Sequence, residues 1–448
     1  MQQTLAEESR KSATYRNVAR VTCGNFLEMF DFMVYGFYAG VIAKVLFPSG
    51  DDYAGLLLSW MTFGAGFLMR PLGAVFLGAY ADKHGRRAGL LLSLSLMAVG
   101  VVLIAVVPSY STIGVAAPAI VLVGRLLQGF SAGAESGTVS VYLVEIAPKG
   151  REGLFASLQT WSQQVAVIFA ASIGIALRLW LTPAEMAAWG WRVPFIIGSA
   201  LIPFLLAVRR SVQETEAFKR RGAHPGMAQI WRTLLLNWRL VGTAMMMITL
   251  TSVMFYMVTA YMATFGSDVL RLAPTASFLV TMCVGFANLV WIPVMGSLSD
   301  RIGRPPIMLA AASATALFAY PCMEWLVADP SFWRLFTVQM FLGSLYGMWQ
   351  GVLIVTIVEL MPVNVRIAGW SIAYSLTYAI FGGFTPALVT WLIHATGDKA
   401  MPGAVLVPAA VIGLIGTLLA RKHLHRTAPL LAEERETPVY GVQKEAGK

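Results

Sequence analysis

The feature that most constrains this chain is a succession of long apolar stretches that carry almost no charge. Apolar residues make up 57% of the 448 residues and charged residues only 12%, whereas a soluble globular protein carries about 25% charged residues. A transmembrane helix needs about 20 apolar residues, so this content suffices for on the order of 12 helices. The sequence therefore predicts an all-α polytopic membrane protein rather than a soluble domain.

Hydropathy divides the chain into twelve expected membrane helices, most of them joined by short loops. They span residues 18–47, 53–79, 89–107, 116–146, 154–181, 190–208, 240–267, 274–298, 306–326, 333–360, 366–395 and 401–420. We expect five regions: an N-terminal tail (1–17), a six-helix half (18–208), a polar linker (209–239), a second six-helix half (240–420) and a C-terminal tail (421–448).

The net charge of +10 indicates orientation in a membrane rather than a nucleic-acid partner. With twelve alternating helices, 25 of the 33 Lys and Arg residues fall on the side that holds both termini. An excess of Lys and Arg marks cytoplasmic loops, so both tails and the linker are expected to be cytoplasmic. No signal peptide is apparent, because residues 1–17 are polar and the first apolar segment is too long. The expected surroundings are a lipid bilayer, and we expect a monomer that binds no nucleic acid.

Two elements recur in the second half of the chain. The loop GAYADKHGRR (78–87) matches GSLSDRIGRP (296–305) at an offset of 218 residues. A glycine stripe in the fourth helix recurs in the tenth at an offset of 214, as Gly129, Gly133 and Gly137 against Gly343, Gly347 and Gly351. Glycines at this spacing are typical of close helix packing. The repeats indicate two six-helix halves in parallel orientation.

Four segments carry a resemblance to a known family. They read GNFLEMFDFMVYGFYAGVIAK (24–44), GFLMRPLGAVFLGAYADKHGRR (66–87), GRLLQGFSAG (124–133) and QETEAF (213–218). Together with the repeated loop, they resemble the major facilitator superfamily, and within it the citrate and tricarballylate carriers of the metabolite:proton symporter branch. The resemblance covers essentially all twelve expected helices.

The resemblance implies proton-coupled uptake of a tricarboxylate across a bacterial inner membrane, by rocker-switch alternating access. It implies a transporter rather than an enzyme, with no catalytic residue, metal or cofactor. It also implies a gating role for charged residues of the two repeated loops. In the outward-facing state they would hold the cytoplasmic side closed: Asp82, Arg86, Asp300 and Arg304.

The first helix carries a polar face. Glu28, Asp31, Tyr35 and Tyr38 fall within an arc of about 80° at 100° per residue, and Asn25 precedes them. Asp31 lies near the expected bilayer midplane, where a polar group is costly unless it is paired or functional. We predict that Glu28 and Asp31 take part in proton coupling and that the other three bind substrate. A structural network is the alternative interpretation.

The fourth helix adds Arg125, Gln128 and Glu135. Only Arg70 and Arg125, among the Lys and Arg residues, lie within expected helices away from their ends. A guanidinium can bind a carboxylate through two hydrogen bonds, so Arg125 is a candidate substrate ligand, with Gln128 beside it and Glu135 as a third proton-coupling candidate. Alternatively, Arg125 forms a permanent ion pair with Asp31 or Glu135. Arg70 precedes a proline beside the repeated loop, and we expect it to serve a conformational role.

Neutral polar residues complete the expected site. Each can be a packing contact, but at one depth they predict a central cavity between the halves: Gln159, Gln163, Tyr256, Asn288, Tyr346, Gln350, Tyr374 and Tyr378. A trianion brought next to one arginine would leave charge uncompensated, so co-transported protons are expected. The alternative substrates are a dicarboxylate or a zwitterionic osmolyte of the proline/betaine type.

Overall fold

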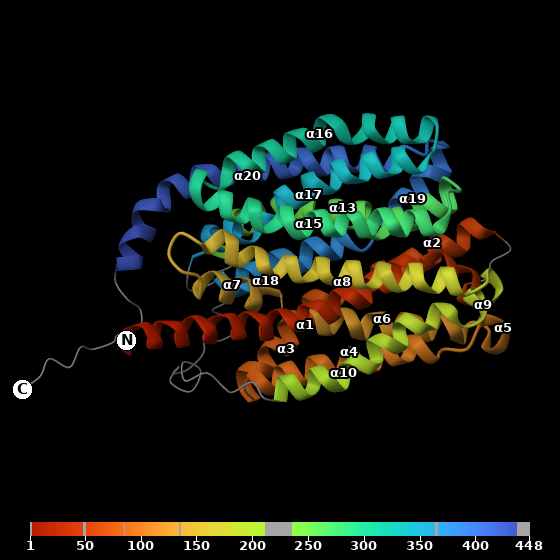
Figure 1. The fold of residues 1–448 in the computed structure, drawn as a ribbon, viewed down its shortest axis with the longest axis horizontal. Coiled ribbons are helices and arrows are strands. Elements are labelled where there is room, and N and C mark those ends of the chain that lie inside the picture. Colours follow the sequence, from red (N-terminus) through yellow and green to blue (C-terminus); the bar gives the residue numbers. More distant parts are fainter. Residues whose placement is uncertain are drawn as a thin grey trace, which may run out of the picture.

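The computed structural model describes residues 2–47, 51–84, 86–133, 136–210, 235–362 and 366–436. In those residues every regular element is a helix. The helices up to α10 pack together, as do those from α13 onward, and the two groups lie side by side (Figure 1). The all-helical fold class predicted from the sequence is confirmed.

The first group holds ten α-helices and a 3₁₀ turn. They are α1 (Gln2–Leu46), α2 (Asp52–Leu68), α3 (Arg70–His84), α4 (Arg86–Val106), α5 (Tyr110–Ile113), α6 (Ala116–Ala132), α7 (Ser136–Glu145), α8 (Glu152–Trp180), α9 (Pro183–Ala188), η1 (Gly190–Arg192) and α10 (Val193–Arg210). The helix α1 begins at Gln2, so the expected N-terminal tail continues the first membrane helix.

The second group contains three π-helical segments, η2, η3 and η5. Its elements are α13 (Trp238–Phe255), η2 (Tyr256–Tyr261), α14 (Met262–Thr264), η3 (Phe265–Val269), α15 (Pro274–Ile302), α16 (Arg304–Ala328), α17 (Phe332–Leu360), α18 (Arg366–Thr377), η5 (Tyr378–Gly382), α19 (Thr385–Thr396) and α20 (Met401–Glu436). Segments α13 to η3 form one path through the bundle, as do α18 to α19. Each therefore fills one expected membrane helix.

Nine helices in the described part of the chain are long and apolar enough to cross a membrane. Two shorter apolar helices, Leu91–Val106 and Ala116–Ala132, and the helix α10 occupy the other three expected positions. Large apolar side chains point outward on several of these helices, among them Val99, Ile196 and Leu317. Apolar side chains on the outside of a bundle indicate contact with lipid. The count of twelve membrane helices stays a prediction.

The bundle has two distinct ends. We call the end where α1 begins and α20 ends the terminal end, and the opposite one the far end (Figure 1). Three exposed tryptophans, Trp180, Trp325 and Trp333, lie at helix ends that face the far end. Tryptophan is enriched at membrane–water interfaces, so these side chains mark where the bundle would leave the hydrocarbon.

The glycine stripes form the close helix contacts that their spacing predicts. A Cβ added to Gly129 would meet the backbone carbonyl of Gly66, so α6 and α2 touch backbone to backbone. In the second group, a Cβ on Gly351 would lie 2.5 Å from the carbonyl oxygen of Ile292, which joins α17 to α15 in the same way. The two repeats therefore use glycine at equivalent helix pairs.

Candidate functional site

A buried arginine–carboxylate pair joins α1 to α6. Arg125 Nη1 lies 3.3 Å from Asp31 Oδ2, and Gln128 Nε2 donates to Asp31 Oδ1 at 3.0 Å. The Arg125 guanidinium also lies 3.9 Å from the ring centroid of Tyr35. Asp31 and Arg125 are only 2% and 1% exposed. We call Asp31, Tyr35, Arg125 and Gln128 the Asp31 cluster.

The Asp31 cluster contains donors and an acceptor without partners. Arg125 Nε and Nη2 and Gln128 Oε1 are buried and form no hydrogen bond in the structure. Leaving such groups unpaired costs about 1–3 kcal/mol each, and more when the group is charged. The ion pair with Asp31 that the sequence left open is present, and the unused Arg125 donors keep its role as a substrate ligand a prediction.

A second arginine–carboxylate pair lies where the two groups of helices meet. Arg70 Nη2 is 3.3 Å from Glu28 Oε1, and the arginine is 2% exposed. Its guanidinium carbon lies 4.8 Å from the ring centroid of Phe32 and 4.5 Å from that of Phe67. We define the Arg70 cluster as Glu28, Phe32, Phe67, Arg70, Tyr256, Tyr374 and Tyr378.

The tyrosines of the Arg70 cluster come from the second group of helices. The guanidinium carbon of Arg70 lies 5.9 Å from the ring of Tyr374 and 5.5 Å from that of Tyr378. Tyr256 contacts Phe67 at 5.4 Å and Tyr378 at 6.1 Å between ring centroids. The cluster therefore brings residues 28–70 together with residues 256–378. Phe32 also lies 6.0 Å from Arg125, so its ring adjoins both arginines.

Three of the helical paths that carry this cluster depart from regular α-helix beside it. Pro71 lacks the N–H that would continue the helix, and α2 ends at Leu68 while α3 begins at Arg70. Tyr256 and Tyr378 are the first residues of the π-helical segments η2 and η5. Single π-helical turns inside α-helices are frequent at functional sites.

Three predicted substrate ligands instead satisfy one another between α1 and α8. Asn25 Nδ2 donates to the Gln159 carbonyl at 2.9 Å, and Gln163 Nε2 donates to Asn25 Oδ1 at 3.1 Å. Ser140 on α7 donates to Gln159 Oε1 at 2.7 Å. These bonds match the packing interpretation of each amide, and substrate binding by these residues stays a prediction.

Gln350 connects the two groups of helices. Its Nε2 donates to Thr160 Oγ1 on α8 at 3.1 Å, and its Oε1 accepts from Thr251 Oγ1 on α13 at 3.1 Å. Trp349 Nε1 also donates to the Thr251 hydroxyl, at 2.7 Å. Because Thr160 and Thr251 belong to different groups, a movement of one group against the other must stretch or break this bridge.

The remaining predicted ligands lie in separate surroundings. The Tyr38 ring is 6.3 Å from that of Phe278, and its buried hydroxyl has no partner. Asn288 is completely buried beside Gly347, and neither of its amide atoms is hydrogen-bonded. Tyr346 lies 5.7 Å from the ring of Phe255. The structure thus groups some of the predicted residues around Arg70 and Arg125, while others lie apart from both arginines.

At the terminal end the predicted gating residue Asp300 links the two groups, and the predicted gating residue Arg304 pairs with it from the same group. Asp300 accepts the backbone N–H groups of Gly153 and Leu154 at 2.8 and 3.1 Å. Arg304 pairs with Asp300 at 2.6 Å and with Glu359 at 3.1 Å. The negative charge therefore caps the N-terminus of α8, where helix dipole and free N–H groups favour an anion.

Contacts also close the far end. The imidazole of His394 stacks on the ring of Tyr53 at 3.8 Å, and Thr264 donates to the Gly36 carbonyl at 3.3 Å. The groups therefore touch at both ends of the bundle. A cavity of about 380 Å³ opens at this end, lined by Lys44, Arg178 and other residues.

Removal of the Asp300 carboxylate should loosen the terminal end. Losing a helix cap costs about 0.5–2 kcal/mol. We therefore expect Asp300→Ala to raise the ratio of terminal-open to terminal-closed protein about two- to thirtyfold. Spin labels at Arg151→Cys and Ile302→Cys, in a cysteine-free background, would report the separation of α8 from α15. Asp329→Ala removes a far-end surface carboxylate and should leave the distance distribution unchanged. An unchanged distribution in Asp300→Ala would contradict the gating role.

Part of the predicted site lies outside what the structure describes. Glu135 falls in the gap between α6 and α7. The side chains of Asp82 and Arg86 are also outside the described set, although their backbones belong to α3 and α4. The proton-coupling role of Glu135 and the gating roles of Asp82 and Arg86 stay predictions.

The sequence interpretation missed the position of Arg70. A conformational role was expected from its proline neighbour and the adjacent loop, whereas the structure buries it against Glu28 and tyrosines of the second group. The signal was present in the sequence, because only Arg70 and Arg125, among the Lys and Arg residues, lie within expected helices away from their ends. A buried arginine is costly unless it forms an ion pair or binds a ligand. This argument predicts a partner for Arg70 as well as for Arg125.

Comparisons with known proteins agree with the fold. The family model described as "Major Facilitator Superfamily" matches residues 21–366. A citrate-proton symporter from Klebsiella pneumoniae is 50% identical over 400 residues, which cover 89% of this chain and 90% of that protein. A citrate-proton symporter from Salmonella typhi is 47% identical over 416 residues, covering 93% of this chain and 96% of that protein.

A solved structure of a proton:xylose symporter superposes with a TM-score of 0.73 at 17% identity, covering 92% of this chain and 96% of that chain. At this identity the match concerns the fold alone. The family model covers most of the chain, and the relatives span nearly its whole length. The chain is therefore a member of the major facilitator superfamily and a transporter rather than an enzyme.

Proposed function

We propose that the protein is a proton-coupled symporter that takes up citrate, with tricarballylate as a second substrate. The names of the two relatives support the substrate and the coupling. The observation that carries the proposal in this chain is the buried Asp31–Arg125 pair, in which Arg125 keeps two unused N–H donors. Those donors can bind a substrate carboxylate, while Asp31 exchanges a proton.

Charge explains why protons accompany the substrate. A tricarboxylate that enters the bundle meets two buried arginines, each already balanced by a carboxylate. Additional negative charge in a site of low dielectric is costly. Protonation of Asp31 or Glu28 would free an arginine for a substrate carboxylate and would keep the site close to neutral. Proton uptake and substrate binding would then favour each other.

The arrangement in the membrane is also part of the proposal. We place the terminal end in the cytoplasm, because most Lys and Arg residues flank the helices at that end. Residues 18–208 and 240–420 would move as two halves, with 209–239 as their linker and 1–17 and 421–448 as cytoplasmic tails. We place the protein in a bacterial inner membrane, where it works as a monomer.

Uptake into proteoliposomes tests this proposal. We expect radiolabelled citrate to accumulate when the outside is more acidic than the lumen, and a protonophore to abolish the accumulation, because the proton gradient supplies the driving force. Unlabelled citrate and tricarballylate should compete, whereas proline and glycine betaine should not. Protonophore-sensitive uptake of a betaine or of a dicarboxylate, without uptake of citrate, would overturn the proposal in favour of the alternative substrates.

A further inference from the structure

The Arg70 guanidinium is incompletely used by its carboxylate partner. Glu28 Oε1 lies 3.3 Å from Arg70 Nη2, at the long end of a hydrogen bond, while Arg70 Nε is buried without any partner. Nε and Nη2 form one edge of the guanidinium, and that edge matches the two oxygens of a carboxylate. A carboxylate bound along it would pair the nitrogen that Glu28 leaves unpaired.

The position of Arg70 is that of a substrate site rather than a packing contact. Its guanidinium lies within 6 Å of rings from both groups of helices, Phe32 and Phe67 from the first group and Tyr374 and Tyr378 from the second. A ligand bound here would contact both groups of helices, so its binding would depend on how the two groups are positioned against each other. Tyrosine hydroxyls are hydrogen-bond donors, which suits a ligand with several carboxylates.

We propose that Arg70 binds a carboxylate of the transported tricarboxylate by displacing Glu28, and that the displaced Glu28 takes up a co-transported proton. The inference rests on the proposed function and adds a second arginine to it. The substrate carboxylate forms two hydrogen bonds with Nε and Nη2 of Arg70, and the bond from Nη2 to Glu28 breaks. Glu28, once Arg70 has turned to the substrate, accepts a proton from water at the open side and releases it when Arg70 returns.

The groups around Glu28 permit this exchange. Besides Arg70 on α3, four tyrosines act electrostatically within this cluster: Tyr256 of η2, Tyr346 of α17, Tyr374 of α18 and Tyr378 of η5. These tyrosines are neutral near pH 7, so they do not replace the positive charge that Glu28 loses. Asp31, one turn away on α1, pairs with Arg125 instead. Each acidic residue therefore has its own arginine.

Citrate binding to purified protein in nanodiscs separates this proposal from a structural role. Calorimetry in two buffers of different ionisation enthalpy gives the number of protons taken up per citrate bound. We expect Glu28→Gln to bind citrate at least as tightly as the unmodified protein but to take up about one proton fewer. Protonation of citrate itself contributes equally to the values for the unmodified protein and for Glu28→Gln, so it cancels in their difference.

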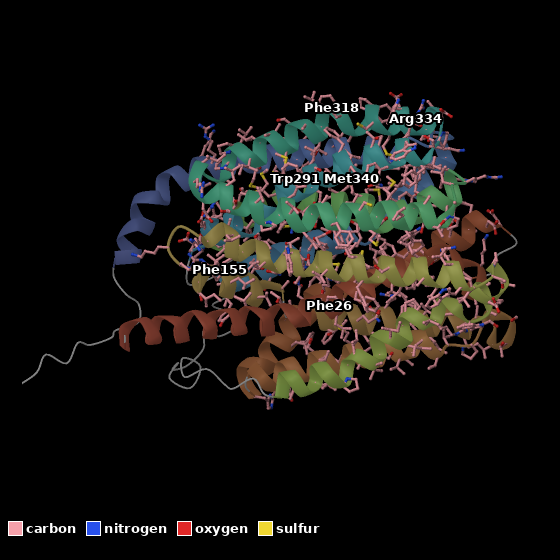
Figure 2. The ribbon with its side chains drawn as sticks, viewed as in Figure 1. Phe26, Phe155, Trp291, Phe318, Arg334 and Met340 are labelled. Carbon is pink, nitrogen blue, oxygen red and sulfur yellow. The ribbon has the colours of Figure 1, made fainter. Side chains whose placement is uncertain are left out.

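Arg70→Gln should weaken citrate binding at least about tenfold, the value of one charged hydrogen bond. Because it also takes the Arg70 charge away from Glu28, the double variant Arg70→Gln with Glu28→Gln tests the same loss without the Glu28 carboxylate. The double variant should have the melting temperature of the unmodified protein and should still bind citrate more weakly than that protein does. Arg334→Gln is the matched control, since Arg334 lies at the edge of the bundle and pairs with the exposed Asp329 (Figure 2).

Two results would overturn the inference. One is a Glu28→Gln variant that takes up as many protons per citrate as the unmodified protein. The other is a folded double variant that binds citrate with unchanged affinity. Failure of the proposed function looks different, because the unmodified protein itself would then bind no citrate.

Discussion

Asp31→Asn is expected to lower citrate accumulation sharply while citrate exchange continues. An asparagine cannot exchange a proton, so one of the two proposed coupling groups is lost and a pH gradient should support a much smaller ratio of internal to external citrate. Exchange of labelled for unlabelled citrate needs no net proton movement and should persist. The measurement is uptake into proteoliposomes with an imposed pH gradient, followed by counterflow in the same preparation. Accumulation in Asp31→Asn as high as in the unmodified protein would exclude Asp31 as a coupling group.

A second variant distinguishes coupling from stability. Removing one partner of a buried ion pair costs about 3–5 kcal/mol, because the other charge stays behind unpaired. Asp31→Asn should therefore lower the melting temperature, and Arg125→Gln added to it should restore much of that loss. If the pair is only structural, the stable double variant recovers accumulation. If the pair couples protons to substrate, accumulation stays as low as in Asp31→Asn.

Gly129→Val is expected to prevent the protein from reaching its folded state. A side chain at this position meets the backbone carbonyl of Gly66, and a backbone cannot turn aside as a flexible side chain can. Overpacking of a core costs about 1–3 kcal/mol even where neighbours adjust, and here two helices must separate along their contact. Fluorescence-detected size-exclusion chromatography should show loss of the monodisperse peak.

The chain offers a matched control for that change. Gly242 lies in α13, and a Cβ added there would have no neighbour within 4 Å. Gly242→Ala should preserve the chromatographic peak, while Gly129→Ala should lower the melting temperature. Equal behaviour of the two alanine variants would show that the close contact between α2 and α6 does not determine stability.

Much of this fold could be predicted because a bilayer imposes simple rules on sequence. Apolar length located the helices, and the repeated loop together with the glycine stripes indicated two equivalent halves. The polar face of the first helix grouped Asp31 with Tyr35, and both contact Arg125 in the structure. These features depend on spacing within one helix, which a sequence displays directly.

The partners across helices could not be predicted in this way. Nothing in the spacing shows that Glu28 pairs with Arg70 while Asp31 pairs with Arg125, because this depends on how α2 ends before Pro71. The π-helical turns that begin at Tyr256 and Tyr378 likewise depend on contacts between helices. Asn25, Gln159 and Gln163 have the composition of a binding site but satisfy one another.

The two partners in the contact between Asp300 and α8 differ in how sensitive they are to mutation. On one side it needs a carboxylate, but on the other it uses the main-chain N–H groups of Gly153 and Leu154. Every residue except proline supplies that N–H, so position 154 can vary freely without loss of the contact. A deep mutational scan should therefore show one intolerant partner at 300 and one permissive partner at 154. Covariation between the two positions would be absent, although they touch.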